Sequence, residues 1–107
     1  MANEHFLAQL WATIESRKAE AGPEKSYTRE LLANPSKARK KVAEEAHEVN
    51  EAHQALLAGQ DTKDHLAHEA ADLIYHLFVV LASADVTPAE VYAVLESRHH
   101  KKPRTGL

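Results

Sequence analysis

The chain has 107 residues, a formal net charge of −3 and no cysteine. This length allows one domain with a modest core of a few packed helices. The charge argues against general binding to nucleic acid or acidic membranes, and the lack of cysteine excludes disulfides and thiolate metal sites. The N-terminus does not resemble a signal peptide, and the longest apolar run, residues 73–84, is shorter than the ~20 residues that span a bilayer. We therefore expect a single soluble, cytoplasmic domain over residues 1–107, with a core at about 4–98.

A first amphipathic helix is predicted at roughly residues 4–20. Apolar side chains recur there at spacings of three and four, and Gly22-Pro23 ends the pattern. We interpret three of these side chains as core groups rather than as base-stacking groups: Leu10, Trp11 and Ile14. Residues 23–35 predict a loop with one embedded turn, which Thr28 caps.

Two longer helices follow. The second predicted helix begins at Pro35 or Ser36 and runs to Gly59, a natural C-terminal cap. Its apolar stripe consists of Ala38, Val42, Ala46, Val49, Ala52 and Leu56. The third begins with Asp61 or Thr62 as its cap. Its stripe consists of Leu66, Ala70, Leu73, Leu77, Val80 and Ala84.

A fourth helix begins at the capping box formed by Thr87 and Glu90, after Asp85 ends the third, and residues 98–107 read as a frayed tail. No segment alternates with period two over a useful length, so the fold class is all-α. Between Leu73 and Leu81 the third helix is apolar almost all round, which in so small a domain requires cover on both faces. We therefore predict a four-helix bundle completed by homodimerisation.

Acidic residues on the second and third helices lie where apolar residues are expected. Glu45 falls in the middle of one stripe with Glu48 at its edge, and Glu69 and Asp72 repeat this arrangement on the next helix. Buried carboxylates cost several kcal/mol unless they are paired or bind a metal ion. Oxygen ligands suit Mg²⁺ or Mn²⁺, so the pattern predicts a divalent metal site. A solvated acidic face is the alternative, which explains Glu44 well but Glu45 and Glu69 poorly.

Basic residues crowd the first turns of the second helix, where the helix dipole favours negative charge. They are Lys37, Arg39, Lys40 and Lys41. An anion bound nearby would make these positions favourable, since helix N-termini are ready phosphate sites. Lys41 is the best single candidate because it lies one turn before Glu45 on the same face.

The histidines allow a different metal site. Glu44 and His47 form an ExxH motif of the kind found in di-iron four-helix bundles, and Asp72 with His76 has chelating spacing. The partner helix offers ExxD rather than ExxH, which favours the oxygen-only site. We interpret His53, His65 and His68 as surface residues.

Four sequence motifs together resemble a known family. They are LWATIESR at residues 10–17, SYT at 26–28, KVAEEAHE at 41–48 and EAADLIYH at 69–76. In this order they resemble the MazG-type all-α nucleotide pyrophosphohydrolases and, within that group, the phosphoribosyl-ATP pyrophosphohydrolase family of histidine biosynthesis. The resemblance covers the chain from about Phe6 to Arg98.

The resemblance implies hydrolysis of the α–β phosphoanhydride of phosphoribosyl-ATP, which gives phosphoribosyl-AMP and pyrophosphate and requires Mg²⁺. Carried over by position, Glu45, Glu48, Glu69 and Asp72 would ligate the metal ion. Glu44 is then the candidate for orienting or deprotonating the attacking water. The candidates for holding phosphate or ribose-phosphate oxygens are Arg17, Lys25, Ser26, Tyr27 and Lys41.

Two other functions remain open at this point. A house-cleaning dNTP pyrophosphohydrolase of the MazG type would share the acids but would not require the SYT segment or the first-helix motif. A non-catalytic helical dimer would use the acids to bind a structural metal ion or a partner surface.

Overall fold

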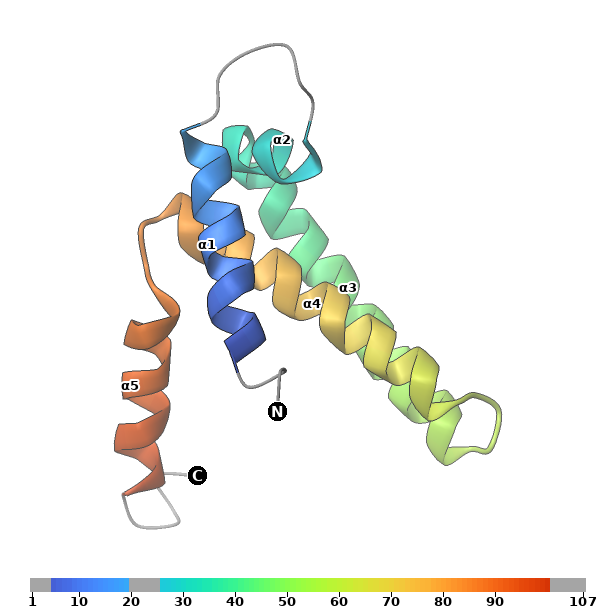
Figure 1. The fold of residues 1–107 in the computed structure, drawn as a ribbon. Coiled ribbons are helices and arrows are strands. Elements are labelled where there is room, and N and C mark those ends of the chain that lie inside the picture. The colour runs from blue at the N-terminus through green and yellow to red at the C-terminus, as the bar shows by residue number, and fades with distance from the viewer. Residues whose placement is uncertain (1–4, 20–25, 101–107) are drawn as a thin grey trace.

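A computed structural model describes residues 5–19 and 26–100, and every element in these two ranges is an α-helix (Figure 1). The helices are α1 (Phe6–Lys18), α2 (Tyr27–Ala33), α3 (Pro35–Leu57), α4 (Lys63–Ser83) and α5 (Pro88–His99). The predicted all-α class is therefore confirmed for the described residues. The predicted stop at Gly22-Pro23 and the end of the predicted tail, residues 101–107, lie outside them.

The long antiparallel hairpin of α3 and α4 carries the fold, and α1 and α2 lie across its open end (Figure 1). The core sits at this end and consists of Ile14, Leu31, Ala38, Phe78, Val79 and Ala82. Trp11 packs with its ring edge-on to Phe78, at 5.8 Å between ring centroids. The interpretation of the first-helix apolar residues as core groups is thus confirmed.

Capping side chains fix where the helices begin. Asn34 caps α3 with Pro35 at its first position, and Thr62 caps α4. At the start of α5 the predicted capping box is present: the Thr87 backbone N–H donates to Glu90 at 2.6 Å, and the Glu90 backbone N–H donates to the Thr87 hydroxyl at 3.3 Å. These local polar contacts agree with the predicted boundaries.

Each helix of the hairpin is followed by a residue with a left-handed backbone conformation. Gly59, just after α3, has φ of 75°, and Asp85, just after α4, has φ of 57°. The Asp85 carboxylate also accepts from Lys18 Nζ at 2.7 Å, which ties the end of α4 to the end of α1. Asp85 thus terminates α4, as predicted, and helps to dock α1.

The region predicted as a loop with one turn contains the helix α2, so the described residues hold five helices rather than four. Ser26, not Thr28, caps this helix: its hydroxyl accepts from the Arg29 backbone N–H at 3.3 Å. Thr28 instead makes a hydroxyl contact with Tyr75 on α4. The helix forms because Leu31 is completely buried in the core, a tertiary contact that the local pattern does not reveal.

One face of α4 remains open in the single chain. Ile74 and Leu77 are each 41 % exposed and Ala84 is also exposed, so the single chain leaves this part of the predicted stripe uncovered. Helix α5 stands apart from the hairpin (Figure 1). The radius of gyration is 16.2 Å, whereas a compact chain of about 100 residues has about 13 Å. The subunit is therefore more open than a closed bundle.

Helix α4 is long and apolar enough, by length and composition, to cross a membrane. Its buried residues Phe78, Val79 and Ala82 belong to the core that α1 and α2 complete. The same helix carries Glu69 and the buried His76. These features favour a core helix of the folded domain over a membrane span.

Candidate active site

Three carboxylates converge between the two helices of the hairpin. Glu45 and Glu48 project from α3 and Glu69 from α4, and one oxygen of each lies within 4.8 Å of the others. Asp72, the fourth predicted ligand, lies outside this group on an exposed position one turn further along α4. The structure thus brings together three of the four predicted ligands from residues far apart in sequence.

Two of these carboxylates each have a buried oxygen that no protein group among the described residues satisfies. Glu45 is 8 % exposed, and the Oε2 atoms of Glu45 and Glu69 are both buried without a hydrogen-bond partner. A buried ionised carboxylate is costly unless it is paired or coordinates a cation. The donor set is all oxygen, which fits a hard divalent ion such as Mg²⁺ or Mn²⁺.

The pKa values show how strongly the acids influence one another. Burial, followed by the nearby Glu48, Asp72 and Glu69 carboxylates, raises the pKa of Glu45 to about 7. A hydrogen bond shared between Glu48 and Glu69 lowers the pKa of Glu48 and raises that of Glu69. A proton retained among these groups relieves their repulsion, and a bound divalent cation does the same.

A histidine touches this group from the outside. His65 places Nε2 at 3.2 Å from Glu69 Oε1 and Nδ1 at 2.6 Å from Asp61 Oδ2. The Asp61 carboxylate, followed by that of Glu69, raises the pKa of His65. The prediction that His65 is a surface residue is confirmed, but its contact with Glu69 was missed. The spacing of four residues on each side of His65 is the signal that indicates it.

Lys41 and Glu44 extend the site toward the start of α3. Lys41 Nζ lies 3.4 Å from Glu44 Oε2, and this pairing raises the pKa of Lys41. The Tyr27 side chain makes a smaller electrostatic contribution in the same direction. A basic groove of about 440 Å³ continues from here, lined by Asn34, Ser36, Lys37, Lys40, Lys41 and Glu44.

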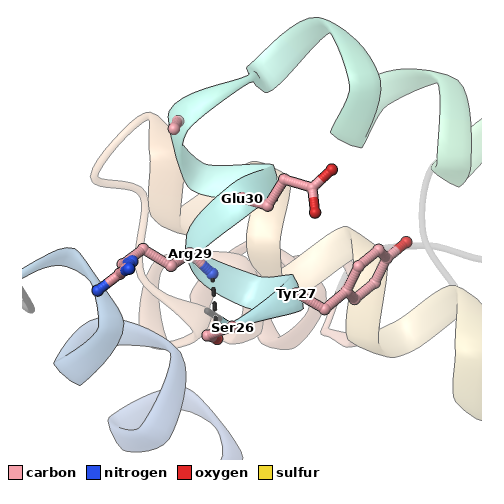
Figure 2. Close-up of a pocket in the computed structure, with 5 residues that line it drawn as sticks. Ser26, Tyr27, Arg29 and Glu30 are labelled. Carbon is pink, nitrogen blue, oxygen red and sulfur yellow. Dashed lines mark hydrogen bonds between the residues drawn. The ribbon is translucent and has the colours of Figure 1, made fainter. Parts of the chain in front are cut away.

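The SYT segment supplies the N-cap and the first two residues of α2. Figure 2 shows Tyr27 and Arg29 projecting in opposite directions from the first turn of the helix, with Ser26 bonded to the Arg29 backbone. A cavity of about 570 Å³ is lined by Ser26, Tyr27, Arg29, Glu30 and Ala33. Arg17 is close enough to α4 for its charge to act on Tyr75. Lys25, the remaining predicted substrate residue, lies outside the described residues.

The histidine contacts disfavour a di-iron site. His76 is buried, with Nδ1 at 2.8 Å from the Asp72 backbone carbonyl and Nε2 at 2.9 Å from the Tyr27 hydroxyl, so both ring nitrogens are engaged. His47 is largely exposed and lies 3.3 Å from Glu51. Neither histidine joins the three converging carboxylates.

Comparison with known proteins gives a consistent result. Residues 7–99 match the family described as phosphoribosyl-ATP pyrophosphohydrolase. The chain is 48 % identical over 93 residues to a phosphoribosyl-ATP pyrophosphatase of Cereibacter sphaeroides, covering 86 % of this chain and 84 % of the relative. The corresponding proteins of Jannaschia sp. and Halobacterium salinarum are each 45 % identical, over 87 % and 86 % of this chain and 86 % and 95 % of the relatives.

Proposed function

The chain belongs to the phosphoribosyl-ATP pyrophosphohydrolase family, as a phosphoribosyl-ATP pyrophosphatase of histidine biosynthesis, and we propose that it uses Mg²⁺ to cleave the α–β phosphoanhydride. The products are phosphoribosyl-AMP and pyrophosphate. The observation that carries this proposal is that Glu45 and Glu69, which bring carboxylate oxygens within 4.8 Å of each other across the hairpin, each have a buried oxygen without a hydrogen-bond partner. A cationic cofactor satisfies them, and a triphosphate substrate requires one.

The metal ligands in this proposal are Glu45, Glu48 and Glu69, with Asp72 as the fourth. Asp72 is close enough to raise the pKa of both Glu45 and Glu69, which supports its inclusion. Mg²⁺, or Mn²⁺, supplies charge stabilisation at the phosphate oxygens when it is bound. Carboxylates from the two helices α3 and α4 would hold the ion, with no ligand from a loop.

Glu44 is the proposed general base. Glu44 follows the basic first turns of α3 and precedes Glu45 directly in the sequence. Its partly exposed carboxylate pairs with Lys41. In this role Glu44 orients the attacking water and accepts its proton while the anhydride P–O bond breaks and pyrophosphate leaves. Because Glu44 is exposed and Glu45 is buried, we assign proton transfer to Glu44 and metal binding to Glu45.

We assign substrate binding to the basic and hydroxyl residues predicted from the sequence. Lys41 and Arg17 provide positive charge for phosphate oxygens, and Ser26 and Tyr27 provide hydroxyl groups from α2. Lys25 belongs to the same proposed set from its position in the sequence. Residues from α1, α2 and α3 would thus hold the nucleotide against the carboxylates of the hairpin.

A homodimer is the proposed assembly. Helices α4 and α5 both expose large apolar side chains in the single chain. Those that are more than 40 % exposed include Ile74, Leu77, Tyr92, Val94 and Leu95. A second copy that covers α4 would bury them and complete the bundle. We place the enzyme in the cytoplasm, with α4 serving as a core helix rather than a membrane span.

Pyrophosphate release measured on the purified protein tests the function. With Mg²⁺, we expect rapid release from phosphoribosyl-ATP and little from dNTPs. Preferred turnover of dNTPs would instead support a house-cleaning enzyme, and no turnover of either substrate would support a non-catalytic metal-binding dimer.

A further inference from the structure

A chain of ring contacts joins the SYT segment of α2 to the helix that carries Glu69 and Asp72. The Tyr27 hydroxyl lies 2.9 Å from His76 Nε2, and the Tyr27 ring stacks on Tyr75 at 6.2 Å with an interplanar angle of 21°. The His76 ring packs edge-on against both tyrosines, at 5.7 Å and 5.0 Å. His76 is only 6 % exposed, whereas Tyr27 is 43 % exposed. A buried imidazole thus fixes the tip of a tyrosine that remains accessible from outside.

The direction of the hydrogen bonds follows from the partners. His76 Nδ1 lies 2.8 Å from the Asp72 backbone carbonyl, which only accepts, so Nδ1 carries the hydrogen. In a neutral imidazole the other nitrogen then has a lone pair, and the Tyr27 hydroxyl must donate its single hydrogen to it. The Tyr27 oxygen therefore has only lone pairs left to offer a ligand. A phosphate needs a donor, so Tyr27 in this state is not a phosphate-binding group.

We infer that His76 is a positioning residue that holds the Tyr27 hydroxyl as a hydrogen-bond acceptor for a donor group of the nucleotide, either a ribose hydroxyl or the exocyclic amine of the base. The inference rests on the proposed function. Tyr27 has the location that this role requires, because it lines the cavity of about 570 Å³ beside Ser26 and Arg29 while its hydroxyl is tied to α4 one turn beyond Asp72. The SYT segment then takes part in recognising the nucleoside, and the cationic residues bind the phosphates.

Steady-state kinetics of Tyr27→Phe with phosphoribosyl-ATP at pH 8 test the inference. Loss of one hydrogen bond remote from the reacting phosphate should raise KM about 3- to 10-fold and leave kcat unchanged. His76→Asn, which lacks an acceptor at the Nε2 position, should match this change, and the double variant should be no worse than either single variant. His76→Gln, which places an amide group near that position, should restore KM toward the wild-type value. If the double variant shows the sum of two independent losses, His76 does not act through Tyr27.

A matched control separates positioning from helix docking. Tyr75→Phe removes the hydroxyl contact with Thr28, a second link between α2 and α4, but leaves the Tyr27 hydroxyl in place. We expect it to keep the wild-type KM. An equal rise in KM in Tyr75→Phe would show that loosening α2 is enough, and would overturn the inference.

Two further measurements identify the donor and the tautomer. With substrate whose ATP portion carries a 2′- or 3′-deoxyribose, the effect of Tyr27→Phe should disappear if that hydroxyl is the donor, and an effect that persists with both analogues assigns the donor to a hydroxyl of the phosphoribosyl group or to the exocyclic amine. Imidazole ¹⁵N NMR should show His76 protonated at Nδ1 only, and protonation at Nε2 instead would contradict the inference. If the wild type turns over phosphoribosyl-ATP but Tyr27→Phe has an unchanged KM, this inference fails while the proposed function stands.

Discussion

Glu45 on α3 and Glu69 on α4 face each other across the helical hairpin, and each has a buried Oε2 without a hydrogen-bond partner. The two helices run antiparallel (Figure 1), and carboxylate oxygens of the two residues lie within 4.8 Å of each other. In the absence of a cation the two acids repel each other in a place that excludes water. The site is therefore a source of instability that a bound metal ion would remove.

The stability of the metal-free protein should fall as the pH rises through the titration range of Glu45. Its pKa is raised from 4.5 to about 7, so the folded state binds more protons than the unfolded state between these values. The stabilisation is complete below about pH 4.5 and is lost as pH passes 7, and a shift of this size corresponds to about 3 kcal/mol. Urea unfolding in EDTA from pH 5 to 8 measures this change. Mg²⁺ should stabilise the protein more at pH 8 than at pH 5.5, and an equal effect at both values would count against Glu45 as a ligand.

Glu45→Gln should separate metal binding from folding. At pH 8 the amide removes a buried charge, so the metal-free variant should be more stable than the wild type by an amount on the order of 1–3 kcal/mol. It should also lose both the Mg²⁺-induced rise in melting temperature and pyrophosphate release. Glu44→Gln is the matched control, because this neighbouring acid is exposed and lies outside the converging carboxylates. We expect Glu44→Gln to keep the Mg²⁺-induced stabilisation and to lose turnover.

Helical phase was enough to predict the convergence of Glu45 and Glu69, because their side chains fall on the stripes that bury α3 and α4. The helix α2 was not predictable in the same way, since its seven residues are held by the burial of Leu31 against other helices. The contact between Tyr27 and His76 joins residues 49 positions apart, and one sequence carries no local signal for it. The exposure of Leu77 has a related cause: the single chain supplies nothing to cover it, and the sequence-based prediction relied on a second copy for that cover.

Leu31→Ala should show that α2 belongs to the core. Leu31 is fully buried, and truncating such a side chain leaves a cavity that costs about 2–5 kcal/mol of unfolding free energy. Leu57→Ala is the control, because Leu57 is 75 % exposed at the far end of α3 and should change stability by less than about 0.5 kcal/mol. Denaturant unfolding at pH 7 measures both variants. A loss below about 1 kcal/mol for Leu31→Ala would mean that α2 is only a surface turn.

The open face of α4 should be the dimer interface. Light scattering at micromolar concentration is expected to give twice the mass of one chain for the wild type. Leu77→Glu should give the mass of a single chain, because the interface would then bury an unpaired charge at a cost of several kcal/mol in each subunit. Leu57→Glu introduces the same charge at an exposed position near the closed end of the hairpin and should remain dimeric. A monomeric wild type, or a dimeric Leu77→Glu, would show that this face of α4 is not covered by a second copy.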